Sequence, residues 1–375
     1  MVSLKPFLRG LLWGLVLLWL ILPGDSGFYA GENSQKRLKS AVPSQETLPP
    51  DRSPEGLEAA LPEGRSIDRE LPENGGMAGA SDSPLMAGDS AVLPGEIPAS
   101  GAPPPMRQPS RGELVMKALA QAYPDRIGPA EFRDEDWAVP IGEAWFYYAE
   151  GRLLPQELRA AFAEYDPQPF YNYPADLPPW KAPTAEEGER IRSQTRRRLQ
   201  HPPKRSQHFY DTLWRASSRN EAWDRVKSLR FLGRPVYVHY SILEELALVE
   251  ERIIAESRTN GEIKRWIDSL EVLDGWNWRS IADTQSRSFH AYGAALDLLP
   301  KSGGKESYWA WTSRTKSDWW TVPYSQRLHP PDVVIKAFEA YGFVWGGKWM
   351  YYDTMHFEYR PEIFILSGLP LTAPR

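Results

Sequence analysis

Aromatic residues are distributed so unevenly along this chain that they decide which part of it can form a folded core. Between Ala30 and Ala122 there is no Phe, Tyr or Trp, and the segment is rich in Pro, Gly, Ser and Glu. Such a segment buries too little apolar surface to offset the entropy lost when its backbone is ordered. In contrast, 14 of the 16 Trp residues follow residue 130. We therefore predict a disordered linker at 27–111 and a folded part from about residue 112 onward.

The first residues have the features of a secretory signal peptide. Lys5 and Arg9 precede an uncharged, largely apolar run, Gly10–Gly24, and the small residue Ser26 follows shortly after it. This run is shorter than the roughly 20 residues that a membrane-spanning helix needs. We expect residues 1–26 to be a signal peptide cleaved on export, with a retained membrane anchor as the alternative. Either interpretation predicts an exported protein of the periplasm or cell envelope.

Net charge and cysteine content exclude several classes of protein. The formal charge of −5 gives no general case for nucleic-acid binding, which usually requires a basic face. The absence of cysteine excludes disulfides and thiol peptidases. A core of this size is stable without disulfides even outside the cytoplasm.

Local sequence patterns predict the elements of the folded part. Gly112–Pro124 has the apolar stripe of a helix, and Trp137–Pro174 is predicted as helices broken by Pro and Gly, so that 112–225 is expected to be a helical accessory region. Arg234–Ser241 alternates as a strand does, and Ser241 is expected to cap a helix over Ile242–Ser257. A further helix is expected from about Pro331 to Gly342. A second folded domain is predicted at 226–375, and it contains the motifs that predict its zinc peptidase function, which are described next.

Two clusters of polar residues carry the candidate chemistry: SFHAYGAALD, Ser288–Asp297, and DTMH, Asp353–His356. His290 and Asp297 are seven residues apart, so an unbroken strand would direct them to opposite faces, and a bend at Gly293 is needed to bring them together. Two imidazoles and one carboxylate form a typical catalytic zinc site with a fourth position open to water.

The same residues resemble a known family. The first cluster matches the SxHxxGxAxD signature of the D-alanyl-D-alanine carboxypeptidase (VanY-like) zinc metallopeptidases, which also include L-alanyl-D-glutamate endopeptidases. GFVWGGKWMYYDTMHFE is similar to the second motif of that family. The resemblance covers roughly Val272–Pro361, under a third of the chain. It implies that the zinc ligands are His290, Asp297 and His356. It also implies that the general base is Asp353 and that the substrate-contacting arginine is Arg279.

Each predicted role has an alternative. Asp353 would accept a proton from water and pass it to the leaving amine, and Glu358 is its rival as the base. Arg279 would hold the oxyanion or a substrate carboxylate, or would form an ion pair with Asp274 or Asp283. Ser288 would hydrogen-bond the substrate or only cap a turn. The remaining four histidines are predicted to be core or surface residues.

Two further segments have open interpretations. The Trp-rich insert Tyr308–Pro331 either lines a substrate groove or packs against the domain. The basic run Ile191–Arg205 is predicted to be a solvated helix face, because acidic residues precede it, and binding of an anionic polymer is the alternative.

The expected fold is α+β, with a small, mostly antiparallel sheet and packed helices of the kind shared by these peptidases and hedgehog-like proteins. The expected activity is zinc-dependent hydrolysis of the peptidoglycan stem peptide in a bacterium, most simply as a carboxypeptidase. An L-alanyl-D-glutamate-type endopeptidase, a wall-binding protein that has lost turnover and a zinc-dependent signalling module are the alternatives. The oligomeric state is not indicated by the sequence.

Overall fold

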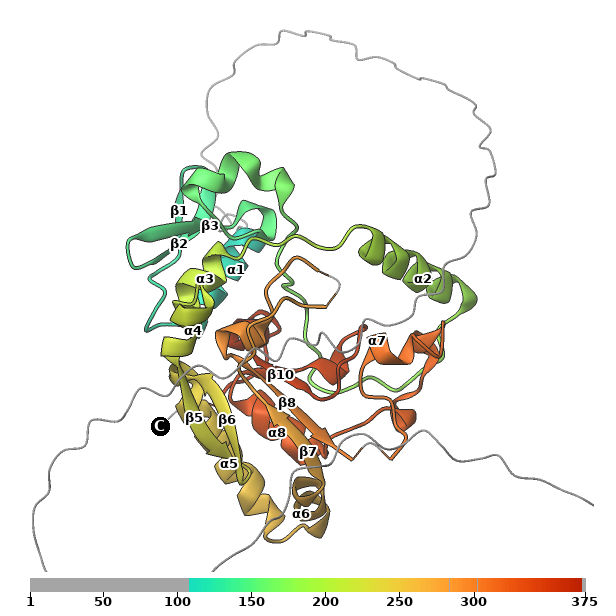
Figure 1. Cartoon of the computed structure of the whole chain (residues 1–375). Coiled ribbons are helices and arrows are strands. Elements are labelled where there is room, and N and C mark those ends of the chain that lie inside the picture. The colour runs from blue at the N-terminus through green and yellow to red at the C-terminus, as the bar shows by residue number, and fades with distance from the viewer. Residues whose placement is uncertain (1–107, 283, 302, 373–375) are drawn as a thin grey trace, which may run out of the picture. The chain divides into compact units, whose positions relative to one another are not determined.

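The computed structural model describes residues 108–282, 284–301 and 303–372 (Figure 1). The predictions of a signal peptide or anchor at 1–26 and of a linker up to residue 107 lie outside these residues. Among the described helices, none has both the length and the hydrophobicity that a membrane span requires.

The elements of the described chain are as follows. The α-helices are α1 Arg111–Ala122, α2 Ala185–Gln200, α3 His208–Trp214, α4 Arg219–Arg225, α5 Leu243–Ser257, α6 Gly261–Asp268, α7 Trp309–Thr312, α8 Asp332–Ala340 and α9 Pro361–Leu366. The strands are β1 Glu131–Arg133, β2 Asp136–Ile141, β3 Ala144–Tyr147, β4 Leu154–Pro155, β5 Val226–Phe231, β6 Arg234–His239, β7 Leu270–Asp274, β8 Ala295–Pro300, β9 Phe343–Trp345 and β10 His356–Tyr359. The 3₁₀ helices used below are η2 Gln156–Glu164, η3 Tyr240–Ile242 and η4 Phe289–Tyr292.

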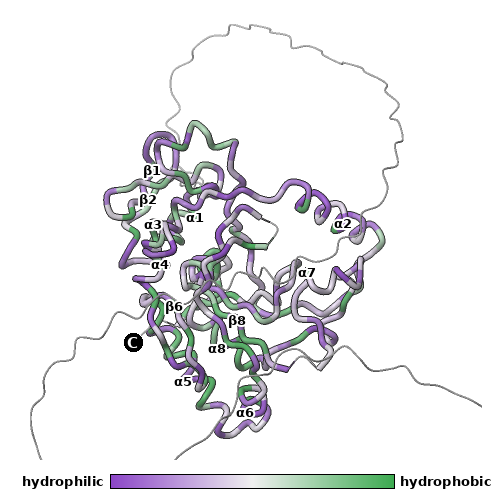
Figure 2. Tube along the Cα trace, in the orientation of Figure 1, coloured by the Kyte–Doolittle hydropathy of each residue, from purple (hydrophilic) through white to green (hydrophobic). Residues whose placement is uncertain are grey.

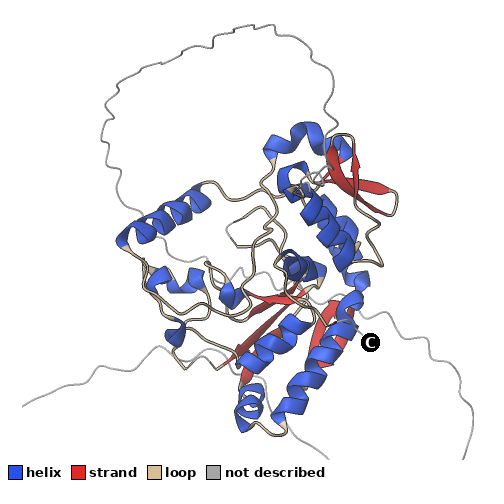
Figure 3. Cartoon of the chain, turned by 180° about the vertical axis from the view of Figure 1, so that it is seen from behind, coloured by secondary structure: helices blue, strands red, loops and turns tan. Residues whose placement is uncertain are grey.

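A four-stranded antiparallel sheet of order β7-β8-β10-β9 supports the site. Helix α8 lies behind this sheet in Figure 1 and in front of it in the reverse view of Figure 3, so it covers one face of the sheet. Helix α5 packs beside α8 and against the β5–β6 hairpin. Phe357 of β10 stacks on Phe338 of α8, with ring centroids 4.1 Å apart. The predicted α+β fold with a small antiparallel sheet is therefore confirmed.

The β5–β6 hairpin lies beside the segments that carry the first motif. Trp276 N donates to Tyr237 O over 2.7 Å, and His239 N donates to Gly293 O over 2.8 Å. The predicted strand over Arg234–Ser241 and the helix that follows it are both present as β6 and α5. Ser241 does not cap α5, however. It lies within η3, and its hydroxyl is 2.8 Å from His239 Nδ1.

The prediction that Trp137–Pro174 is helical is wrong for its first half. The segment forms β2, β3 and β4, which join β1 in a second antiparallel sheet of order β1-β2-β3-β4, and its helical parts are the 3₁₀ helices η1 (Ala149–Gly151) and η2. A two-residue turn joins β2 to β3, with Gly142 at its first position and a φ of +60°. Such a glycine favours a β-hairpin, and the aromatic residues on either side favour strands. The accessory region is therefore mixed α and β.

Helix α1 joins two parts of the chain in one core. Below, the part before residue 226 is called the accessory region, and the part from residue 226 onward, where the peptidase motifs lie, is called the peptidase region. The Ser110 hydroxyl accepts from Glu113 N over 3.1 Å and caps the helix, and Val115, Met116 and Leu119 are fully buried. These side chains belong to the same hydrophobic cluster as Phe357. Figure 2 shows the contrast between the apolar β8 and the hydrophilic α2.

Helix α2 packs against the Trp-rich insert. Thr184 and Glu187 form a capping box at its N-terminus. On its buried side, Ile191 packs in a cluster with aromatic residues of the insert and of the segment before Asp353: Trp309, Trp319, Trp320 and Tyr352. Most of the insert therefore packs against the domain, as one of its two interpretations predicted. Trp311 is exposed and lines the cavity described below.

Candidate metal centre

Strand pairing brings the three predicted ligand residues together. His356, the first residue of β10, lies directly opposite Asp297 of β8. His290 lies in η4, which ends at Gly293 with a φ of +70°, and the chain then turns into β8. The bend that the spacing of His290 and Asp297 predicts is therefore present at Gly293. Together the three side chains form a group whose ligand atoms lie within 4.8 Å of one another.

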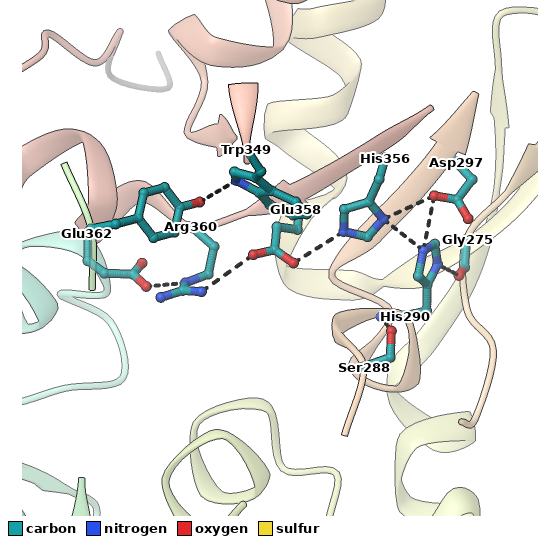
Figure 4. Close-up of polar contacts among 10 residues, drawn as sticks. Gly275, Ser288, His290, Asp297, Trp349, His356, Glu358, Arg360 and Glu362 are labelled. Atoms are coloured by element: carbon teal, nitrogen blue, oxygen red, sulfur yellow. Dashed lines mark hydrogen bonds and ion pairs between the residues drawn. The ribbon is translucent and has the colours of Figure 1, made fainter. Parts of the chain in front are cut away.

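The three ligand atoms form a nearly equilateral triangle (Figure 4). His356 Nδ1 is 3.0 Å from Asp297 Oδ1, His290 Nε2 is 3.2 Å from the same oxygen, and the two nitrogens are 3.1 Å apart. Zinc bound at about 2.0–2.1 Å in a tetrahedron places its ligand atoms roughly 3.3 Å apart. The triangle therefore fits one face of a zinc tetrahedron.

Hydrogen bonds outside the triangle direct both imidazole lone pairs into it. His290 Nδ1 is 2.6 Å from the carbonyl of Gly275, which can only accept, so Nδ1 carries the proton and Nε2 presents its lone pair. His356 Nε2 is 3.2 Å from Glu358 Oε2 and donates to that carboxylate, so Nδ1 presents its lone pair. Two lone pairs and one carboxylate oxygen thus converge, an arrangement that a divalent cation satisfies.

The electrostatics of the triangle also favour a cation. Burial alone would raise the pKa of Asp297, but the charges and hydrogen bonds of His290 and His356 hold it well below its usual value. Burial would lower the pKa of His356, but hydrogen bonds with Asp297 and Glu358 raise it to about 10. The residues present therefore fit a zinc ion. Without a metal, the two carboxylates stabilise a protonated imidazole, and a bound zinc ion would replace that positive charge.

Asp353 lies in the same cavity and has an unsatisfied oxygen. Its backbone N donates to Gly346 O over 3.0 Å, and its carbonyl accepts from His356 N over 3.3 Å, which forms the turn expected between the two residues. Its Oδ1 is buried and has no hydrogen-bond partner among the described residues. Burial, followed by the charge of Asp297, raises the pKa of Asp353 to about 7. A carboxyl group with such a pKa is matched to proton transfer at neutral pH.

Glu358 supports the ligand His356. One oxygen accepts from His356 Nε2 and the other lies 3.4 Å from Arg360 Nη1. Arg360 also pairs with the fully buried Glu362, and Tyr123 donates to Glu362 over 2.9 Å. Since both oxygens of Glu358 are engaged, Glu358 is poorly placed to act as a general base.

Arg279 and Ser288 line the cavity beside the triangle. Arg279 is exposed and forms no ion pair with any described residue, so the predicted alternative with Asp274 is not formed, and Asp283 lies outside the described residues. Its charge reaches Asp353, whose pKa it lowers. The Ser288 hydroxyl accepts from His290 N over 3.3 Å and caps η4. The substrate-binding roles of both residues remain predictions.

The cavity has a volume of about 820 Å³ and is bounded by both regions of the chain. The peptidase region supplies Asp297, Asp353 and His356, while the accessory region supplies Tyr171 and Arg198 among others. Sequence analysis missed this second wall because it depends on contacts between distant segments. It also missed the carbonyl of Gly275 and the role of Arg360, although the alternation His356, Glu358, Arg360 along one strand face was visible in the sequence.

The comparisons with known proteins agree with the motifs. Residues 282–359 match a family model described as D-alanyl-D-alanine carboxypeptidase. A second model, described as a domain of unknown function, matches residues 115–170. No curated protein and no solved structure matches the chain. Residues 282–359 therefore form a domain of the D-alanyl-D-alanine carboxypeptidase family, the family that the two motifs predicted.

Proposed function

We propose that this protein is a zinc-dependent peptidase that hydrolyses peptidoglycan stem peptides, with D-alanyl-D-alanine carboxypeptidase activity as its reaction. The observation that carries the proposal is the convergence of His290 Nε2, His356 Nδ1 and Asp297 Oδ1 at 3.0–3.2 Å from one another beside the unsatisfied Oδ1 of Asp353. Export to the periplasm or cell envelope, through residues 1–26, is part of the proposal.

In this proposal His290, Asp297 and His356 hold the ion. When bound there, Zn²⁺ would supply the chemistry of a Lewis acid: it would polarise a carbonyl and lower the pKa of water toward about 7. The hydrogen bonds to Gly275 and Glu358 keep each imidazole in the tautomer that binds metal. Asp353 takes the proton of the attacking water and returns it to the leaving amine, a role for which its pKa of about 7 is suited.

Arg279 favours a carboxypeptidase over an endopeptidase. It is a guanidinium without an ion-pair partner among the described residues, in the same cavity as Asp353. A carboxypeptidase needs such a group to bind the terminal carboxylate of its substrate, whereas an endopeptidase does not. An endopeptidase that cleaves between L-Ala and D-Glu is the second candidate, because Asp rather than Glu at the base position, Asp353, resembles the endopeptidase branch of the family.

The test is to incubate the purified, zinc-loaded protein with defined stem peptides, with and without chelator, and to identify products by mass. Chelator-sensitive release of free D-Ala is the expected result. Cleavage between L-Ala and D-Glu would support the endopeptidase instead. Metal binding with no cleavage of any stem peptide would reject both and favour a wall-binding or signalling protein.

A further inference from the structure

Two arginines of the basic run lie in the wall of the cavity, although the sequence predicted a solvated helix face. Arg198 is in the last turn of α2, and Arg205 is in the loop between α2 and α3. Both line the cavity that holds Asp297, Asp353 and His356. The neighbouring Arg196 and Arg197 are exposed and do not line it.

Helix α2 is held in place by contacts with the peptidase region, and these contacts position Arg198. Thr195 Oγ1 is 3.3 Å from the hydroxyl of Tyr351, and Ile191 is buried among the aromatic residues of the insert. The guanidinium of Arg198 lies 5.3 Å from the centroid of the Tyr351 ring. Tyr351 precedes Asp353 by two residues, so this contact connects α2 to the segment that carries the proposed base.

The loop that carries Arg205 is anchored next to the first motif. Arg205 N donates to Ser286 Oγ over 3.3 Å, and Ser286 Oγ donates to Pro203 O over 3.1 Å. On the other side, Asp166 N donates to Lys204 O over 2.8 Å, and Lys204 N donates to an oxygen of Asp166. The loop is therefore fixed between the accessory region and the residues just before Ser288.

The charges of the cavity wall are not balanced. Arg287 pairs with Asp211, and Arg360 pairs with Glu358 and Glu362. Neither Arg198 nor Arg205 forms an ion pair with any carboxylate in the described part of the chain. Within residues 108–372, as far as they are described, Arg205 Nε donates only to the carbonyl of Pro167, over 3.1 Å, and the buried Nε of Arg198 has no hydrogen-bond partner.

Two guanidinium groups in the wall of one cavity repel each other, and a bound anion offsets that repulsion. The charge of Arg198 acts on Arg205, whose pKa is lowered first by burial and then by this repulsion, with Asp166 as the carboxylate that opposes it. A planar guanidinium pair matches the oxygens of a carboxylate, and partial burial strengthens the interaction.

We propose that Arg198 and Arg205 form a subsite that binds a carboxylate of the substrate away from the scissile bond, so that the enzyme selects acidic peptides. The subsite lies in the accessory region, outside the family domain at 282–359. Arg279 lines the same cavity from the segment that leads into the first motif, whereas Arg198 and Arg205 line it from the accessory region. The cavity wall thus carries cationic groups from two parts of the chain, and we assign the first to the terminal carboxylate and the second to an internal one. This inference rests on the proposed function, because it assumes a peptide substrate.

The experiment compares two stem peptides that differ only in their internal carboxylates, which are free in one and converted to carboxamides in the other. For the zinc-loaded protein we expect kcat/KM to be about ten- to a hundredfold higher for the acidic peptide, the range of a charge-assisted hydrogen-bonded contact. In Arg198→Gln/Arg205→Gln the ratio should fall toward one. Arg196→Gln, on the exposed side of α2, should keep the ratio, and Arg205→Lys should keep part of it. Thermal unfolding of each variant shows whether the fold is retained.

Equilibrium binding of both peptides to zinc-loaded Asp353→Asn protein, with and without the double substitution, separates the two proposals. If the protein cleaves stem peptides without distinguishing acid from amide, the proposed function stands and the subsite is rejected. If it cleaves neither peptide but binds the acidic one more tightly in an Arg198- and Arg205-dependent manner, the subsite stands and the proposed function is rejected. If the protein neither binds nor cleaves the acidic peptide in preference to the carboxamide peptide, the subsite is rejected.

Discussion

At the scale of single residues, the proposed centre depends on which nitrogen of each imidazole faces the ion. His290 uses Nε2 and His356 uses Nδ1, and in each case the other nitrogen donates to an oxygen that only accepts. The residue type by itself indicates only that a histidine is a possible ligand. The neighbouring acceptor decides the tautomer and therefore whether a lone pair is available.

Asp353→Asn is expected to lower kcat by about 100- to 10,000-fold, because the amide cannot accept the proton. Metal content should be unchanged, since Asp353 is not part of the triangle. The measurements are steady-state kinetics on a stem peptide and zinc content of the dialysed protein. Asp318→Asn, which changes an exposed carboxylate outside the cavity, is the control. Full activity in Asp353→Asn would show that another group is the base.

A glycine is needed at residue 293 for two reasons, a positive φ and the close approach of the His239 backbone, and a pair of substitutions distinguishes them. Its φ is +70°, and an added Cβ would lie 2.7 Å from His239 N. Gly233 has a similar φ of +79° with nothing within 4 Å of an added Cβ. We expect Gly233→Ala to lower the free energy of unfolding by about 1–2 kcal/mol and Gly293→Ala by about 2–5 kcal/mol, because the second adds a steric clash. Denaturant unfolding measures both, and equal losses would mean that the contact with His239 relaxes freely.

At the scale of elements, β10 organises the site through its alternation. His356, Glu358 and Arg360 follow one another at every second position and are joined by hydrogen bonds (Figure 4). Phe357 and Tyr359 point to the other face, where Phe357 stacks on Phe338 of α8 and Tyr359 contacts Phe343. One strand therefore supplies a ligand and its support on one face and the hydrophobic packing on the other.

Glu358→Gln tests the support that β10 gives to its own ligand. We expect zinc affinity to fall by about ten- to a hundredfold, since loss of the carboxylate behind a histidine ligand reduces its basicity and orientation. Competition with a chromophoric chelator measures the affinity. Glu271→Gln, on the exposed side of β7, is the matched control. An unchanged zinc affinity in Glu358→Gln would show that Glu358 serves only as the ion-pair partner of Arg360 and does not support His356 as a ligand.

At the scale of the whole described molecule, the accessory and peptidase regions share one core and one polar network. The network runs from Tyr123, at the end of α1, through Glu362 and Arg360 to Glu358 and the ligand His356. His239 makes another connection, because its Nε2 donates to Trp214 O of α3 over 3.0 Å while its backbone N donates to Gly293 O. Stability of the accessory region and integrity of the site are therefore linked.

The stability of this assembly should fall in weak acid because of His239. Burial lowers the pKa of His239 from 6.5 to about 4, so the unfolded chain binds this proton more readily than the folded protein does. The stability that the neutral, buried His239 contributes is present above pH 6.5 and is lost as the pH falls toward 4. This loss lowers the free energy of unfolding by about 3 kcal/mol. Denaturant unfolding between pH 4 and 7 should therefore show a steeper decline for the wild type than for His239→Gln. His201→Gln, at an exposed position, should retain the wild-type slope. Parallel curves for the wild type and His239→Gln would contradict the assignment.

The sequence by itself determined the features that are coded by neighbouring residues. The helices α1, α5 and α8 and the strand β6 follow from apolar periodicity and from turn residues, and the bend at Gly293 follows from the odd spacing of His290 and Asp297. The ligand types followed from the chemistry of histidine and aspartate. These conclusions needed no knowledge of contacts between distant segments.

Only the tertiary structure decided which distant segments meet. The register that places His356 opposite Asp297 comes from the pairing of β8 with β10. The accessory sheet replaced the predicted helices because residues such as Phe146 of β3 are buried by partners elsewhere in the chain, including Phe209 of α3, and β preference depends on such surroundings. Arg198 and Arg205 belong to a run that is predicted from sequence to be solvated, yet both line the cavity. Ile191 docks α2, and with it Arg198, on the Trp-rich insert, and the bond to Ser286 holds the loop that carries Arg205. Long-range packing, which no short window of sequence contains, therefore determined the shape and charge of the site.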